Sequence, residues 1–183
     1  MMEQFILLKT LKDNYEDILV VLKQLLGNHI TSEEFDNLLL VKSFVHDSKE
    51  IFETIKSLEI DLNTNISVYV TYPSVNPSEE IKLVYDMFSA SEVGCYNLKG
   101  LLLNTKEVKN SVNILDFILN GSGIDEKIIL ALALNDLNVS KASTDLYMHR
   151  NTLLYKIDRL MELKNFDLKK FTDLYILFRL LKA

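Results

Sequence analysis

Residues 138–163 have the sequence NVSKASTDLYMHRNTLLYKIDRLMEL, which predicts two short helices joined by a corner of about three or four residues. Asn138 is a favourable N-cap, because its side-chain oxygen can accept a hydrogen bond from one of the unpaired amides that begin a helix. Ala142 and Leu146 fall four residues apart and give the first helix a narrow apolar stripe.

The second predicted helix follows a corner at residues 147–149, in which Met148 points inward. Its apolar residues recur at i, i+4 and i+7 and therefore lie on one face. These residues are Leu153, Ile157 and Leu160. The opposite face carries cationic, amide and hydroxyl groups, a pattern typical of a helix that reads DNA. Spacing alone also fits an ordinary corner in a helical domain.

The run from Leu146 to Ile157, LYMHRNTLLYKI, resembles the C-terminal helix-turn-helix of the purine-catabolism and sugar-diacid regulators, the PucR/CdaR type of bacterial transcription factor. Its most specific part is HRNTL, at 149–153, followed by a tyrosine and a basic residue. The similarity continues through 158–163 and 166–168, roughly the last third of the chain. It implies a DNA-binding regulator in which a further helix, at 125–134, packs behind the two DNA-binding helices.

Three positions depart from the pattern of that family. Leu154 stands where arginine is usual, and Lys156 stands where arginine is common. Leucine lacks the bidentate donor that arginine offers to guanine or phosphate, and lysine is only a point charge. Asn165 replaces a glycine after the second helix, but asparagine also tolerates the left-handed conformation that ends a helix. Leu154 therefore favours weaker binding or a different recognised sequence.

The predicted DNA interface contains eight residues: Lys141, His149, Arg150, Asn151, Thr152, Tyr155, Lys156 and Arg159. The cationic side chains of the second helix and Tyr155 are the predicted phosphate partners, because phosphate contacts make up most of such interfaces. Asn151 and Thr152 are predicted to read base edges, since asparagine can pair bidentately with adenine. Capping of the helix is the alternative role of both. Lys141 is predicted either to contact the DNA backbone or to remain solvated.

The composition is that of an ordinary globular protein, with 183 residues, 48% of them apolar and 25% charged. No apolar run is long enough to span a membrane, and no signal peptide is recognised. Cys95 is the single cysteine, which fits a reducing compartment. We therefore predict a cytoplasmic protein with no membrane partner.

Charge is divided unevenly along the chain. Residues 124–183 hold ten Lys and Arg against eight Asp and Glu, a balance of +2. Residues 1–123 hold ten against eighteen, a balance of −8, and the two parts give the total of −6. The acidic part should be repelled by nucleic acid. Because +2 is a weak electrostatic footprint, charge alone does not predict DNA binding.

The predicted fold class is α+β, mostly α, with a small sheet in the N-terminal module and a helical C-terminal domain. Residues 5–8 fit either a strand or an extension of the first helix. The glycine-dense loop 120–123 is the predicted boundary, between a regulatory or dimerisation module at 1–121 and a helix-turn-helix domain at 122–183. The other predicted helices are 12–26, 31–42, 47–58, 78–89, 105–119 and 171–181, and the predicted strands are 66–72, 92–96 and 100–104.

In the resembled family a degenerate nucleotide-cyclase-like module, of the GGDEF type, often precedes the helix-turn-helix, and a separate sensor sometimes does. The predicted strand 66–72, helix 78–89 and strand 92–96 are compatible with a shortened module of the first kind. No glycine-glycine-acidic signature is present, so catalysis by it is not predicted. His149 with Asp145 and Ser140 lacks the glycine-flanked turn that exposes a nucleophilic serine. The histidines are scattered and Cys95 has no partner at ligand spacing. We predict neither an enzyme nor a metal site, and no cofactor.

The leading hypothesis is a DNA-binding transcriptional regulator of the PucR/CdaR type that works as a homodimer. A single such helix reads few base pairs, so two copies in successive major grooves are expected. The predicted partners are double-stranded DNA, a second copy of the chain and a small-molecule effector. The alternative is a protein-interaction or ligand-sensing adaptor that keeps the helix-turn-helix fold and has lost DNA binding, which Leu154 and the low net charge favour.

Overall fold

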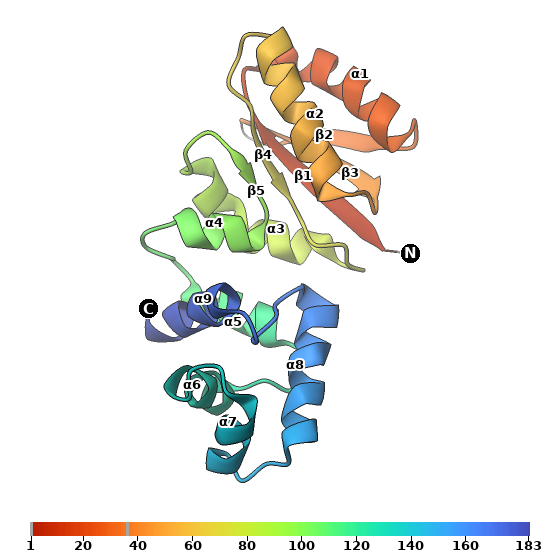
Figure 1. The fold of residues 1–183 in the computed structure, drawn as a ribbon. Helices are drawn as coiled ribbons and strands as arrows, with labels where there is room; N and C mark the ends of the chain where they lie inside the picture. The colour runs from red at the N-terminus through yellow and green to blue at the C-terminus, as the bar shows by residue number, and fades with distance from the viewer. Residues whose placement is uncertain (1, 36) are drawn as a thin grey trace. The chain divides into compact units, whose positions relative to one another are not determined.

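The computed structural model describes residues 2–35 and 37–183 (Figure 1). The described chain forms two compact units, which divide between Asn104 and Thr105. The first contains the sheet and the second is helical, so the predicted α+β class with a larger share of helix is confirmed. The division does not fall in the loop 120–123, because the helix that precedes this loop packs against the last helix of the chain.

A mixed sheet forms the centre of the first unit. Its five strands, within the described residues, lie in the order β2 (Thr31–Phe35), β3 (Leu38–Phe44), β1 (Glu3–Lys9), β4 (Ser67–Val70) and β5 (Cys95–Tyr96). β1 is antiparallel to both β3 and β4, and β5 is parallel to β4. Residues 5–8 are therefore strand, and they form a continuous apolar run because both faces of β1 are covered.

Helices cover both faces of this sheet. α1 (Tyr15–Leu26) and α2 (Ser48–Asp61) pack on the face that carries alternate residues such as Val68 and Val70. Tyr69, between them, points to the other face, where its ring lies 5.9 Å from that of Phe88 in α3 (Pro77–Ser89). A short helix, α4 (Leu98–Asn104), follows β5. The order β1–α1–β2–β3–α2–β4 is that of a ferredoxin-like βαββαβ module.

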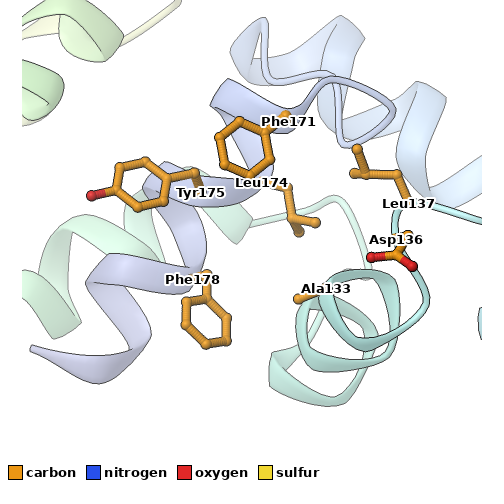
Figure 2. A pocket seen from close by; sticks show the side chains of 7 residues that line it. All are labelled: Ala133, Asp136, Leu137, Phe171, Leu174, Tyr175 and Phe178. Atoms are coloured by element: carbon orange, nitrogen blue, oxygen red, sulfur yellow. The ribbon is translucent and has the colours of Figure 1, made fainter.

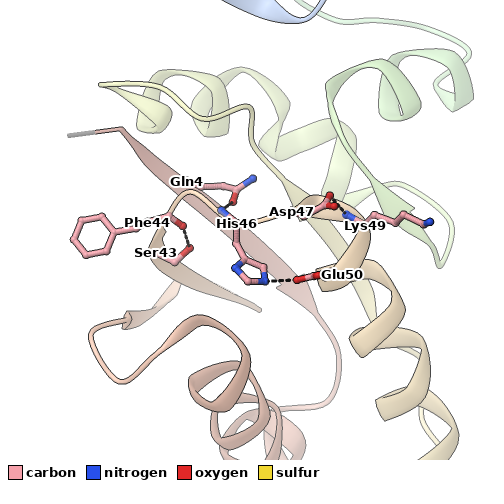
Figure 3. A network of polar contacts seen from close by, with 7 residues as sticks. All are labelled: Gln4, Ser43, Phe44, His46, Asp47, Lys49 and Glu50. Carbon is pink, nitrogen blue, oxygen red and sulfur yellow. Dashed lines mark hydrogen bonds and ion pairs between the residues drawn. The ribbon is translucent and has the colours of Figure 1, made fainter.

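A hydrogen-bond network around the buried Gln4 side chain lies at the connection between β3 and α2 (Figure 3). Gln4 is fully buried; its Nε2 donates to the carbonyl of Thr71 at 3.2 Å and its Oε1 accepts from the amide of His46 at 3.0 Å. Asp47 caps α2 by accepting a hydrogen bond from the amide of Lys49 at 2.9 Å. His46 Nε2 lies 2.7 Å from a carboxylate oxygen of Glu50.

The predicted helix at 31–42 is wrong, because residues 31–35 and 38–42 belong to the paired strands β2 and β3. Phe35, Leu38 and Leu39 have the i, i+3, i+4 spacing of an amphipathic helix, but β3 pairs with β1, which lies far away in sequence. Every residue of β2 is exposed. Lys42 pairs with Glu33 at 2.9 Å and Lys12 with Glu34 at 3.0 Å. Charges of this kind protect an edge strand from pairing with another chain.

Two further predictions about local structure fail. The predicted strand at 100–104 is part of α4, whose Leu98, Leu101 and Leu102 are buried at helical spacing. The predicted helix at 105–119 begins only at Ser111.

Cys95 is half-buried in β5, and burial raises the pKa of its thiol.

The second unit is built from five helices within the described residues: α5 (Ser111–Leu119), α6 (Glu126–Leu134), α7 (Val139–Asp145), α8 (Arg150–Lys164) and α9 (Phe171–Lys182). The helix expected at 125–134 is present as α6, and Asp125 caps it by accepting a hydrogen bond from the amide of Ile128 at 3.0 Å. Lys164 Nζ lies 3.4 Å from the ring centroid of Phe117 and links α8 to α5. No helix in the described part of the chain is long and apolar enough to cross a membrane.

Candidate nucleic-acid interface

α7 starts and packs as its sequence predicts. Oδ1 of Asn138 accepts a hydrogen bond from the amide of Lys141 at 3.1 Å, and Ala142 is fully buried. The carboxylate of Asp145 accepts from Nδ2 of Asn135 at 2.7 Å, which links the end of α7 to the end of α6. α7 therefore has a fixed position on the unit, with Lys141 exposed.

The corner between α7 and α8 is closed by backbone hydrogen bonds. The amide of Tyr147 donates to the carbonyl of Thr144 at 3.1 Å, and the amide of Met148 donates to that of Ser143 at 2.9 Å. This pair of bonds is a Schellman motif, whose left-handed residue is usually glycine. Here that residue is Tyr147, with a φ of +50° and a fully exposed side chain. Tyr147 is not among the residues that the sequence predicts for the site.

His149 lies immediately before α8 and caps it. Its Nδ1 accepts a hydrogen bond from the amide of Asn151 at 3.2 Å, so it is the N-cap of α8. A ring nitrogen that accepts a hydrogen bond carries no proton, which places the proton of the neutral ring on Nε2. The sequence placed His149 in the interface but did not predict this capping role, because histidine is not among the preferred N-cap residues.

The inner face of α8 is the predicted one. Leu153, Ile157 and Leu160 are all fully buried. Asn165 ends the helix in the left-handed conformation, with a φ of 58°, as expected for an asparagine in place of glycine. The helix is thereby held along its whole length, and its outward-facing residues are fixed by the packing of the inward-facing ones.

Five of the predicted site residues are exposed along α8: Arg150, Asn151, Thr152, Tyr155 and Arg159. Arg159 donates from a guanidinium nitrogen to the hydroxyl of Tyr155 at 3.3 Å, so the two side chains lie together on the outer face. Asp158 is an acid on the same helix, and Lys169 lies 2.9 Å from it. This ion pair reduces the repulsion that Asp158 would exert on a phosphate.

Lys156 differs from the other cationic residues of the site because its side chain is half-buried. A Cβ atom at Gly123 would lie 3.6 Å from Cε of Lys156 and 3.7 Å from Cγ, so the aliphatic stem passes close to this glycine. Lysine commonly packs its stem on the protein while the ammonium group stays in water. Leu154 is also half-buried, so it does not lie at the centre of the exposed face of α8.

Charge and ligand chemistry limit what this surface can do. Residues 127–183 hold ten Lys and Arg against six Asp and Glu, a balance of +4. In the residues that the structure describes, no group of three or more His, Cys, Asp or Glu side chains could hold a metal ion. The arrangement offers guanidinium, amide and hydroxyl donors on a helix of modest positive charge, groups that suit phosphates and base edges.

Comparison with known proteins identifies the helical unit. Residues 127–183 match the PucR C-terminal helix-turn-helix domain. No curated protein sequence matches the chain. The crystal structure of a regulator of polyketide synthase expression from Bifidobacterium adolescentis is similar over 99% of this chain and 79% of that chain, with a TM-score of 0.52 and 14% sequence identity. That similarity concerns the fold. The sequence similarity to the PucR C-terminal helix-turn-helix domain is therefore confined to the last third of the protein, residues 127–183.

Proposed function

We propose that the protein is a transcriptional regulator that binds double-stranded DNA through α7 and α8, with the first turns of α8 in the major groove. The observation that carries this proposal is that α8 has one buried apolar face and one exposed polar face. Leu153, Ile157 and Leu160 are fully buried, while arginine, asparagine, threonine and tyrosine side chains are exposed on the other side. The fold shared with a protein described as a regulator of expression supports it.

The exposed residues divide into two roles. Arg150, Arg159 and Tyr155 are proposed to contact phosphates, and Lys141 to contact the backbone from α7. Asn151 and Thr152 are proposed to read base edges. Because His149 supplies the capping hydrogen bond of α8, that role does not need the side chains of Asn151 and Thr152. Lys156 contributes charge from the side of the helix, since its stem follows Gly123.

The first unit is proposed to be regulatory and not catalytic. Residues 1–104 hold eight Lys and Arg against sixteen Asp and Glu, a balance of −8, so this part should not bind DNA. Sensing of a small molecule and additional contacts between copies are the roles proposed for it. We propose that the protein acts as a homodimer in the cytoplasm, because a single recognition helix reads too few base pairs to find an operator.

Binding should be measured by fluorescence anisotropy on a random-sequence duplex and on duplexes selected from a library. The affinity of the wild-type protein should fall steeply between about 50 and 200 mM salt, because bound phosphates release counterions. Arg159→Ala should weaken binding to every duplex and reduce the salt slope by about one.

Lys127→Ala is the matched control, because it removes one exposed positive charge from α6, outside the proposed surface. It should leave the salt slope unchanged. If the wild-type protein forms no salt-sensitive complex with any duplex, DNA binding is excluded, and the adaptor alternative, which the low charge of the domain favours, takes its place.

A further inference from the structure

The outer face of α9 carries three aromatic residues at coiled-coil spacing. Phe171, Tyr175 and Phe178 follow one another at intervals of four and three residues, which places them on one stripe. Phe171 is 71% exposed and Tyr175 is 43% exposed, and their rings stack with centroids 5.9 Å apart. The apolar composition of α9 predicts burial on more than one side, but within the single chain this stripe remains open.

A groove lies beside the stripe (Figure 2). It has a volume of about 420 Å³ and lies between α9, the end of α6 and the loop that follows α6. Its lining residues are Ala133, Asp136, Leu137, Phe171, Leu174, Tyr175 and Phe178. Leu134, the last residue of α6, is 82% exposed next to Ala133. The face therefore combines projecting aromatic rings with an apolar hollow.

We propose that this face, defined by the stripe, the groove and Leu134, is where a second copy of the chain binds. This proposal rests on the proposed function, which needs two recognition helices related by a two-fold axis. In a two-fold dimer the same patch meets itself, so each copy must carry both a projection and a hollow to receive it. The aromatic stripe and the groove supply both on one surface.

Charge on the border of the face is also compatible with self-association. Asp136 is exposed on the rim of the groove, and Lys170 and Lys182 are exposed at the two ends of α9. A second copy can therefore place a lysine against Asp136 of the first, and the two-fold axis repeats the pair.

The face offers apolar area that a second copy could bury. An aromatic side chain has roughly 150 to 250 Å² to bury, so Phe171 and Tyr175 offer on the order of 200 Å² at their exposed fractions. Leu134 and the open groove add to this area, and a specific interface needs about 1,000 Å² in total from the two copies. Complexes at the low end of this size range are often weak, so we expect association in the micromolar range.

The aromatic stripe and the corner between α7 and α8 lie in different parts of the second unit. In the second unit the corner between α7 and α8 lies at the far end from α9 (Figure 1). The aromatic stripe of α9 therefore lies away from the first turn of α8, whereas the Leu134 side of the face is closer to α7, because Asn135 is hydrogen-bonded to Asp145 at the end of α7.

The first experiment measures the mass of the full chain by sedimentation over about 1 to 100 µM, a range that brackets the expected Kd. The wild type should pass from monomer to dimer. Phe171→Glu should remain monomeric at every concentration, because a charge replaces the ring that enters the partner. Val112→Glu is the control, since Val112 is 67% exposed on α5 and does not line the groove; this variant should still dimerise.

A second experiment does not depend on a charged variant that folds. In a Cys95→Ser background, Phe171→Cys and Tyr175→Cys should each give covalent dimers with a short bismaleimide, whereas Val112→Cys should not. A monomeric wild type, a dimer that persists in Phe171→Glu, or the lack of cross-linking at both α9 positions would overturn the proposal. In those cases the groove is left for another protein or for another part of this chain.

DNA binding separates this inference from the proposed function. Phe171→Glu should bind a duplex with two half-sites at least about tenfold more weakly than the wild type, and should keep the wild-type salt slope on one half-site. If neither protein binds DNA but Phe171→Glu still abolishes the dimer, the interface stands and the proposed DNA binding fails. If both proteins bind the double site equally well, the interface is overturned.

Discussion

α8 and α9 are successive helices of one unit, and both bury one apolar face, but their exposed faces differ in chemistry. α8 exposes Arg150, Asn151, Tyr155 and Arg159, whereas α9 exposes aromatic rings. The buried faces are similar because both fill the same core. The two helices therefore suit different partners through their outer faces. The chemistry of α8 suits phosphates and bases, and that of α9 suits an apolar protein surface. The inner face determines the fold and the outer face determines the partner.

The largest effect expected from this division is on stability. Ile157→Ala removes a fully buried side chain from the inner face of α8 and should lower the free energy of unfolding by about 2 to 4 kcal/mol. Tyr155→Ala, on the outer face of the same helix, should change it by less than about 0.5 kcal/mol. Urea denaturation followed by circular dichroism measures both. Equal losses from the two variants would contradict the division into faces.

Base discrimination is the next effect in size. Asn151→Ala should relax the preference at one base position, with a loss of about 1 to 3 kcal/mol of discrimination, and should leave the thermal stability unchanged because His149 caps the helix. Competition binding to duplexes that vary one base pair at a time gives the profile. A uniform loss across all positions would indicate that Asn151 contacts the backbone.

A smaller difference is expected between two cations of the same helix. Arg150→Ala should weaken binding to all duplexes by about 1 kcal/mol, because an exposed guanidinium at the start of α8 can reach a phosphate. Lys156→Ala should have a smaller effect, because its stem is packed near Gly123. The affinity and the salt slope of both variants, measured on one duplex, show which of the two cations contributes more to binding. A larger effect of Lys156→Ala than of Arg150→Ala would indicate that the ammonium group of Lys156 contacts the DNA.

The smallest expected effect is a gain in stability at the corner. Tyr147 occupies a left-handed conformation and is fully exposed, so Tyr147→Gly should raise the free energy of unfolding by about 0.5 to 1 kcal/mol. Thermal unfolding measures the gain, and Tyr147→Ala, which keeps the strain, is the control. A loss of stability in the glycine variant would mean that the Tyr147 ring makes a stabilising contact.

Local signals predicted the helix-turn-helix well. Asn138, Asp125 and Asn165 cap their helices as their residue types predict, and the apolar residues of α8 are buried at the predicted positions. Caps and periodicity depend on residues within a few positions of each other, so they can be recognised without knowledge of the rest of the chain. His149 as a cap and Tyr147 in a glycine conformation were missed, because both are unusual residues for those positions.

The sequence by itself determined the two-helix unit, the class of the fold and the division of α8 into an apolar and a polar face, since these follow from local spacing and residue chemistry. Only the tertiary structure decided that 31–35 and 38–44 are strands, because β3 is stabilised by β1, which is distant in sequence. It also decided that Lys156 packs near Gly123 and that the aromatic stripe of α9 is open. Which side of an apolar helix stays exposed depends on the neighbours that cover it, and those neighbours come from the whole domain.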